Sequence, residues 1–153
     1  MYLENLSITL MNMQDLEMIK DSLYSDFDEF WNYETFETEL TSPLSLYFVA
    51  KYNNEILGFI GCKQIFNELE IMNIVTKISA RGKGIASSLL GYLIQFCKQN
   101  QKSMINLEVN AKNTIAIHLY KKYNFKQIGL RKKYYHQTDD AILMALKIEN
   151  PSK

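Results

Sequence analysis

A glycine-bearing turn, Arg81-Gly82-Lys83-Gly84, stands between a predicted strand and a strongly amphipathic helix. The first N–H groups of a helix have no intrahelical acceptor and carry partial positive charge, so residues 82–87 predict a backbone site for an anion. Gly82 and Gly84 have no Cβ, which lets a phosphate approach the main chain. The turn alone leaves an ordinary strand-to-helix connection as the alternative.

Binding free energies indicate what kind of anion the turn could hold tightly. A helix terminus contributes about 0.3–2 kcal/mol to a nearby anion, whereas micromolar affinity requires about 8 kcal/mol. Several charge-assisted N–H bonds to a pyrophosphate, together with an extended arm that pairs with a strand edge, would supply the difference. A nucleoside triphosphate loop is excluded, because Lys83 is followed by Gly84 and not by Ser or Thr.

A second group of polar side chains follows the next predicted strand. Glu108 lies at the end of that strand, Asn113 at the start of the following helix, and Tyr120 further along the same helix. Asn113 and Tyr120 are two turns apart on one helical face, so both can face one cleft. Without other context, a strand-end carboxylate is commonly solvated and a helical tyrosine commonly packs in the core.

Composition limits the function classes. The chain has 153 residues, with Lys+Arg 17 against Asp+Glu 17, so no broad field exists to attract nucleic acid or an anionic membrane. Cys62 and Cys97 stand in apolar surroundings without a Cys/His cluster, which indicates buried thiols and no metal site. No apolar run approaches the ~20 residues of a membrane span, and no leader is evident, so we expect a soluble, cytoplasmic protein.

Hydrophobic periodicity predicts an α+β domain with a mixed but mostly antiparallel sheet, in the order βααβββαβαββ. Length favours a single domain over residues 1–153, with its core at about 6–147 and a short tail at 149–153. The predicted strands are residues 7–11, 46–50, 56–60, 69–76, 105–109, 125–135 and 141–148. The predicted helices begin after Asn12 (continuing to Leu23), at Tyr33, at Ile85 and after Asn113.

The pattern Arg81-x-x-Gly84-x-Ala86 resembles the Q/R-x-x-G-x-G/A signature of the GNAT superfamily of N-acetyltransferases, and the resemblance extends over roughly residues 6–147. It implies a splayed central sheet, acetyl-CoA as cosubstrate and no metal. In this family the pyrophosphate lies on the turn and the pantetheine arm pairs with the preceding strand. The cofactor site that the resemblance implies comprises Ile74, Val75, Thr76, Arg81, Gly82, Lys83, Gly84, Ile85, Ala86, Ser87 and Asn113.

The segment Leu107-Glu108-Val109, followed by Asn113, Tyr120 and Phe125, is similar to the ribosomal-protein-alanine branch of that family, the RimI branch. The resemblance implies that Glu108 accepts a proton, that Asn113 contacts acetyl-CoA and that Tyr120 donates a proton to the leaving thiolate.

The chain departs from the branch pattern at two places. Phe30-Trp31-Asn32 replaces Pro-Trp-Ser/Thr, and Lys77-Ile78 replaces Asp-Pro after the cofactor strand. The first departure concerns the acceptor half of the site, so it bears on the choice of acceptor.

The function expected from this resemblance is acetylation of a protein N-terminal α-amine, in particular the N-terminal alanine of a small-subunit ribosomal protein. Two alternatives stay open: a family member that acetylates a small amine, a lysine or an antibiotic, and a non-catalytic acyl-CoA-binding module. The basic run Arg131-Lys132-Lys133 in a neutral protein indicates a solvated face and not a nucleic-acid site.

Overall fold

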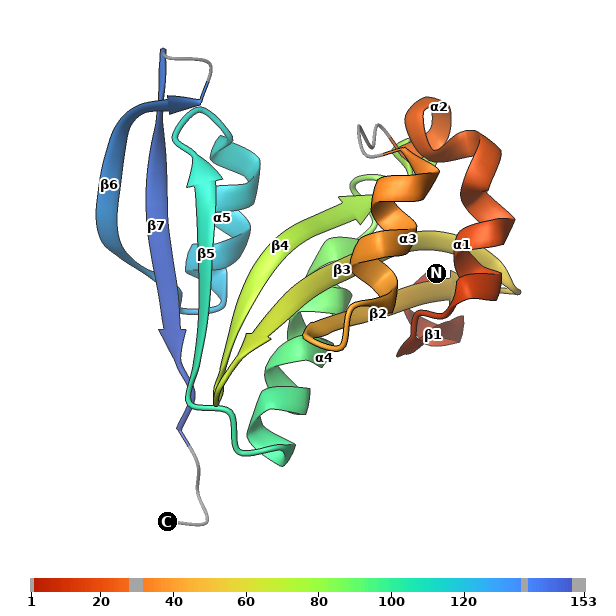
Figure 1. Ribbon diagram of the computed structural model, residues 1–153, viewed down its shortest axis with the longest axis horizontal. Coiled ribbons are helices and arrows are strands. Elements are labelled where there is room, and N and C mark those ends of the chain that lie inside the picture. Colours follow the sequence, from red (N-terminus) through yellow and green to blue (C-terminus); the bar gives the residue numbers. More distant parts are fainter. Residues whose placement is uncertain (1, 28–31, 136–137, 150–153) are drawn as a thin grey trace. The chain divides into compact units, whose positions relative to one another are not determined.

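A computed structural model describes residues 2–27, 32–135 and 138–149. Hydrogen bonds connect seven strands in the order β1-β2-β3-β4-β5-β7-β6. Contacts divide the chain into two compact units, and β4 (Glu68–Thr76) contributes to both of them. Unit 1 comprises Met1–Gln64 and Met72–Leu93, and unit 2 comprises Ile65–Ile71 and Ile94–Lys153. Each unit is described by itself below (Figure 1).

Unit 1 begins with a short 3-10 turn (Tyr2–Asn5), and its first strand is followed by helices, then by three strands and then by the start of a long helix. The strands are β1 (Leu6–Leu10), β2 (Ser45–Tyr52), β3 (Glu55–Ile65) and the second part of β4. The helical elements are α1 (Met13–Ile19), a 3-10 turn (Lys20–Ser22), α2 (Leu23–Phe27), α3 (Tyr33–Thr41), a second 3-10 turn (Ile78–Ala80) and the start of α4 (Ile85–Gln99).

The first predicted helix begins as expected but does not run unbroken to Leu23. Asn12 caps it through a capping box, in which the Asp15 N–H donates to the Asn12 side chain and the Asn12 N–H donates to the Asp15 carboxylate. The prediction of one helix was wrong at Lys20–Ser22, where a 3-10 turn separates α1 from α2. The Ser22 hydroxyl donates to the Ile19 carbonyl at 3.2 Å, a local bond that competes with the regular helical pattern.

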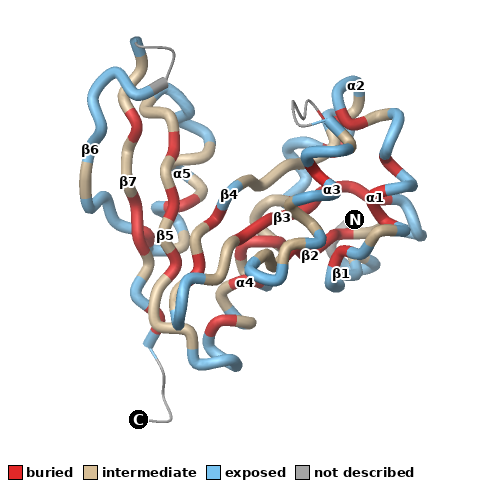
Figure 2. The backbone as a smooth tube through the Cα atoms, viewed as in Figure 1, coloured by how far each residue is buried: buried red, intermediate tan, exposed pale blue. Residues whose placement is uncertain are grey.

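The central strands of unit 1 are buried on both faces, which explains why their sequences are nearly continuous in apolar residues. One face carries Tyr47, Val49 and Phe59, which form a core with apolar side chains of α1, α2 and α3. The other face carries Phe48, whose ring lies 4.9 Å from that of Tyr92 on α4. Figure 2 shows the buried residues concentrated along these strands. The turn between β2 and β3 has Asn53 and Asn54 at positive φ, as the hairpin prediction required.

A buried ion pair ties α1 to β2. The Asp15 side chain is 2% exposed and lies 2.6 Å from the Lys51 ammonium group. Replacing Lys51 with Met leaves that carboxylate buried without its counter-charge, so we expect Lys51→Met to lower the free energy of unfolding by about 3 kcal/mol. Urea denaturation measures this change.

Lys63→Met is the matched control for that substitution. The Lys63–Glu39 pair is longer, at 3.6 Å, and both side chains are more exposed, so the expected loss is below about 1 kcal/mol. The double variant Asp15→Asn/Lys51→Met keeps a capping acceptor and removes both charges, and should recover most of the loss. Equal losses for Lys51→Met and Lys63→Met would contradict the assignment.

Unit 2 contains the first part of β4, the second half of α4, β5 (Met104–Asn110), α5 (Thr114–Lys122), β6 (Lys126–Tyr135) and β7 (Asp139–Lys147). The strand β7 pairs antiparallel with both β5 and β6. Strands β4 and β5 pair in parallel, and this ladder joins only Glu68–Ile71 with Met104–Leu107. The α+β class and the mostly antiparallel sheet are therefore confirmed. No helix in the described ranges is long and apolar enough to cross a membrane.

Candidate active site

The predicted anion-binding turn has the backbone geometry that its glycines were expected to permit. Gly82 has φ 78° and Gly84 has φ 84°, a left-handed conformation that other residues adopt only with strain. The helix α4 begins directly afterwards at Ile85 and runs for 15 residues. Its first N–H groups have no intrahelical acceptor, and the predicted cofactor residues Ile85, Ala86 and Ser87 form this first turn.

The predicted pairing strand lies close to the same turn within unit 1. The Arg81 Nε donates to the Thr76 carbonyl at 3.4 Å, and the Lys83 ammonium donates to the Ser79 carbonyl at 3.4 Å. The Lys77 N–H donates to the Leu57 carbonyl at 2.7 Å, which attaches the end of β4 to β3. The structure thus places Ile74–Thr76 and residues 81–87 in one unit.

Gly58 supports this part of the site, although nothing in the sequence marked it. A Cβ built on Gly58 would lie 2.7 Å from the Val75 carbonyl oxygen and 3.0 Å from Cγ2 of Ile85. Val75 and Ile85 are both predicted cofactor residues. The absence of a side chain at Gly58 therefore lets β3 approach β4 and the start of α4 more closely than any other residue type would allow.

Glu108 lies near the end of β5, and its carboxylate has a defined partner. The buried residues of this strand are Ile105, Leu107 and Val109, so Glu108 projects from the opposite face. Its Oε1 is 3.2 Å from a guanidinium nitrogen of Arg131, and the Glu108 side chain is 26% exposed. Arg131 comes from β6, on the far side of β7, and its guanidinium carbon lies 5.4 Å from the centre of the Tyr134 ring. The basic run is therefore not only a solvated face.

Asn113 and Tyr120 belong to α5, as predicted. The Asn113 side-chain oxygen accepts the Ala116 N–H at 3.1 Å and so caps the helix, and this cap does not use its amide NH₂. Tyr120 is buried, and its ring centre lies 5.5 Å from that of Phe125. Asn124, at φ 71°, ends the helical segment in the left-handed conformation that was expected.

A polar cluster of Asn110, Lys112 and Asp139, called the polar corner below, holds the loop between Glu108 and Asn113. The Asp139 carboxylate accepts from the Asn110 amide at 3.0 Å and pairs with the Lys112 ammonium at 2.8 Å. The hydrogen bond from Lys112 lowers the pKa of Asp139, and the same bond raises the pKa of Lys112. Because the Asp139 pKa is lower in the folded state, this corner contributes stability above the ordinary carboxyl pKa and loses it as the pH falls further.

The two cysteines are not joined in a disulfide. Both are buried, and burial raises the pKa of the Cys97 thiol to about 12, which keeps it protonated near neutral pH. Within the described residues, no cluster of three or more His, Cys, Asp or Glu side chains could hold a metal ion.

The predicted site residues thus fall into two groups, one in each unit. Unit 1 holds the residues of β4 and of the glycine turn, and unit 2 holds Glu108, Asn113 and Tyr120. Within unit 2 the structure pairs Glu108 with Arg131, and it places the Tyr120 ring against Phe125. Phe30 and Trp31 lie outside the described residues, whereas Asn32 caps α3 by accepting the Thr35 N–H at 2.8 Å.

Comparison with known proteins places these features in a family. The model of the acetyltransferase (GNAT) family matches residues 16–125. The [ribosomal protein bS18]-alanine N-acetyltransferase of Escherichia coli (strain K12) is 31% identical over 121 residues, which is 77% of this chain and 81% of that protein. The crystal structure of the ribosomal-protein-S18-alanine N-acetyltransferase from Escherichia coli matches with a TM-score of 0.85 and 26% identity over 94% of both chains.

A more distant structure shows the same fold with the expected cosubstrate. Arabidopsis thaliana NAA60 in complex with acetyl-CoA has a TM-score of 0.79 and 18% identity, and the match covers 94% of this chain and 98% of that one. The family match spans elements of both units, from α1 to the residue before β6. The chain therefore belongs to the acetyltransferase (GNAT) family and is an N-acetyltransferase similar to its ribosomal-protein-alanine branch.

Proposed function

We propose that this chain transfers the acetyl group of acetyl-CoA to the α-amine of a protein N-terminus, and that its acceptor is the N-terminal alanine of a small-subunit ribosomal protein. The observation that carries the proposal is the 31% identity, over most of both chains, to an enzyme named for that acceptor. On this account the two units act together as one catalytic domain in the cytoplasm.

The cofactor half of the proposal rests on the turn of unit 1. Two glycines at positive φ, followed at once by a 15-residue helix, present main-chain donors without a Cβ in front of them. A Cβ at Gly82 would meet no atom within 4 Å, so space is open on that side of the turn. The pyrophosphate of acetyl-CoA would bind to residues 82–87, and its pantetheine arm would pair with Ile74–Thr76. Asn113 would contribute its free amide NH₂.

The chemistry of the proposal is direct attack of the acceptor amine on the thioester. A protein α-amine has a reference pKa of about 7.7–8.0, against about 10.4 for lysine, so a modest base is sufficient near neutral pH. Glu108 takes the proton from the amine, the C–N bond forms as the C–S bond breaks, and the CoA thiolate leaves. Tyr120 donates a hydrogen bond to that thiolate, or the proton itself.

One assay separates this proposal from its two alternatives. The purified protein is mixed with acetyl-CoA and one of three acceptors: a peptide that starts with alanine, the same peptide with a blocked N-terminus and an added lysine, or a polyamine. A mass increase of one acetyl group on the first peptide alone is the expected result. Acetylation of the blocked peptide or the polyamine instead would identify a different acceptor class. Bound CoA with no acetylation would indicate a binding module.

Arg131 is expected to position the Glu108 carboxylate. We predict that Arg131→Gln lowers kcat about ten- to a hundredfold, because a catalytic group displaced by about 1 Å loses rate on this scale. Steady-state kinetics with the alanine peptide measure the loss. Arg131→Lys keeps the positive charge but lacks the planar guanidinium with its paired N–H donors, so this variant should recover part of the lost kcat. Lys132→Gln, on the neighbouring residue, is the control and should leave kcat unchanged.

Gly58 is expected to matter for both stability and cofactor binding. Gly58→Ala forces the Val75 carbonyl to move, so it should cost about 1–3 kcal/mol of unfolding free energy and weaken CoA binding. Urea denaturation and calorimetric titration with CoA measure the two effects.

Gly129→Ala is the control, since its nearest neighbour is the flexible tip of Leu143 at 2.9 Å, which can give way. That substitution should cost less and leave CoA affinity unchanged. If Gly58→Ala bound CoA as well as the parent protein does, the proposed path of the pantetheine arm along β4 would be wrong.

A further inference from the structure

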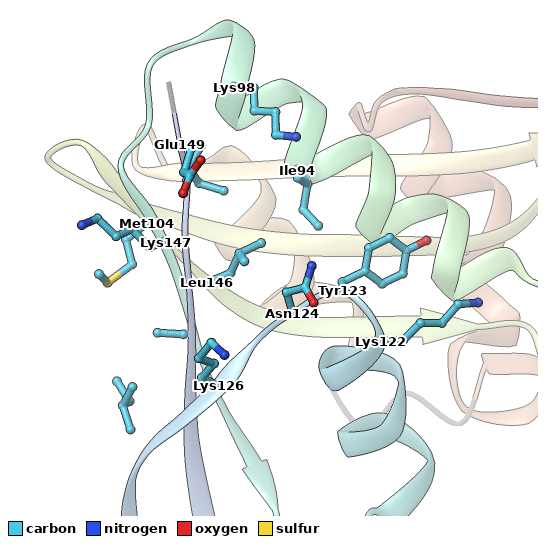
Figure 3. A pocket seen from close by; sticks show the side chains of 13 residues that line it. Ile94, Lys98, Met104, Lys122, Tyr123, Asn124, Lys126, Leu146, Lys147 and Glu149 are labelled. Atoms are coloured by element: carbon cyan, nitrogen blue, oxygen red, sulfur yellow. The ribbon is translucent and has the colours of Figure 1, made fainter. Parts of the chain in front are cut away.

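An open cavity of about 680 Å³ lies within unit 2, and none of its lining residues belongs to the proposed acetyl-transfer site. Its walls come from the C-terminal ends of α4 and α5, the first residues of β5 and β6, and the last residues of β7. Figure 3 shows Ile94 and Leu146 in the middle of the group, with lysine side chains around them. A cavity of this size accommodates a few side chains.

The charge of the cavity differs from that of the whole protein. Four lysines line it, Lys98, Lys122, Lys126 and Lys147, against the one carboxylate of Glu149, so the lining carries a formal charge of 4 − 1 = +3. The complete chain has a formal net charge of +0. The ion pairs formed elsewhere involve Lys51, Lys63, Lys77, Lys112 and Arg131. None of the four cavity lysines pairs with a carboxylate of the described residues.

The same cavity exposes aliphatic side chains between its cations. Ile94, Met104, Ile128 and Leu146 contribute to the lining, and the Ile128 side chain is 64% exposed. Aliphatic groups that are in contact with water favour binding of an apolar partner, because burial of apolar surface lowers the free energy of the complex. Four cations around an aliphatic centre therefore complement a ligand that carries carboxylates around an apolar group.

We propose that this cavity binds an acidic segment of a partner polypeptide, which inserts one or two apolar side chains between Ile94, Ile128 and Leu146 and directs its carboxylates to the surrounding lysines. The cations are all lysines, and Tyr123 is the single aromatic residue of the lining. A nucleic-acid site would use arginines that bind phosphates with two N–H groups and several aromatic side chains that stack on bases. The lining therefore favours a peptide. The proposal depends on unit 2 alone and goes beyond acetyl transfer.

Peptide display tests the proposal on the intact protein. A random peptide library is selected against the parent protein and, in parallel, against Lys98→Gln/Lys126→Gln/Lys147→Gln. We expect the parent to enrich peptides rich in Asp and Glu around a Leu, Ile or Phe residue, and the triple variant not to enrich them. An enriched peptide with a fluorescent label should bind the triple variant at least tenfold more weakly in anisotropy titrations, and its affinity for the parent should fall as salt is added.

Two single variants serve as matched controls. Lys121→Gln changes the neighbour of Lys122 outside the cavity, and Ile115→Ser changes an exposed isoleucine of the same unit that is also outside it. Both should bind the labelled peptide like the parent, whereas Ile128→Ser should bind it several-fold more weakly. Circular dichroism melting verifies that each variant is folded, and acetylation of the alanine peptide should be unchanged in all of them.

Several results would overturn the proposal. They are enrichment of peptides without acidic residues, equal binding of the labelled peptide to the triple variant, and tighter binding of a single-stranded oligonucleotide that depends on the same lysines. Self-association of the protein that is lost in the triple variant would identify a second copy of the chain as the occupant instead. Failure of the acetylation assay would leave the peptide result unaffected, so the two proposals can fail separately.

Discussion

Replacing Glu108 with Gln should lower kcat for acetylation of an alanine-starting peptide by about 10²–10⁴-fold, the range expected for removal of a general base. Glutamine keeps the size of the side chain and can still meet Arg131, so the substitution removes proton acceptance more than it removes packing. Steady-state kinetics at saturating acetyl-CoA measure the effect. CoA affinity should be nearly unchanged, because Glu108 is not part of the proposed cofactor site.

The pH dependence of the kcat loss in Glu108→Gln distinguishes a role of Glu108 as a base from a purely structural role. Above about pH 8 the acceptor amine is already deprotonated, so the difference between parent and Glu108→Gln should shrink toward pH 9. Glu70→Gln, on the neighbouring strand β4, is the control and should behave like the parent at every pH. A deficit that stays constant from pH 6.5 to pH 9 would mean that Glu108 acts by holding Arg131 and the sheet and not by accepting a proton.

Removing the Tyr120 hydroxyl should be the second large effect. We expect Tyr120→Phe to lower kcat by about 10²–10³-fold, comparable to the loss of one donor that stabilises developing negative charge. A phenol of pKa about 10 is a weaker acid than a thiol of about 8.5, so complete proton transfer would be uphill by about 2 kcal/mol. We therefore expect the Tyr120 hydroxyl to act mainly by donating a hydrogen bond to the leaving thiolate.

The kinetic pattern of Tyr120→Phe decides its assignment. If the hydroxyl acts only in the transition state, kcat falls while CoA affinity stays within a few-fold of the parent. The ring keeps its packing against Phe125. Tyr123→Phe, three residues along the same chain segment, is the control and should leave kcat unaltered. Equal losses in kcat and in CoA affinity would assign Tyr120 to cofactor binding instead.

Local chemistry was sufficient to predict most elements from the sequence. Asn12 and Asn113 cap the helices that were predicted to follow them, and Asn53, Asn54 and Asn124 take the left-handed conformations that were expected of them. The glycine turn was predicted as a place where the backbone could bend tightly at little cost, and the positive φ of Gly82 and Gly84 agrees with that expectation. The break at Lys20–Ser22 was missed, because apolar spacing alone does not show that the Ser22 hydroxyl bonds to the Ile19 carbonyl.

Other parts of the site depend on contacts that no local pattern encodes. Arg131 meets Glu108 only because β7 lies between β5 and β6 in a fixed register, which the sequence spacing of the two residues does not specify. The close approach at Gly58 exists only because β4 and α4 pack against β3 at that position. The four cavity lysines come from four separate elements and become one charged lining only after those elements pack. Residue type thus determined the chemistry available to this protein, whereas strand register and close packing between distant segments decided which groups meet.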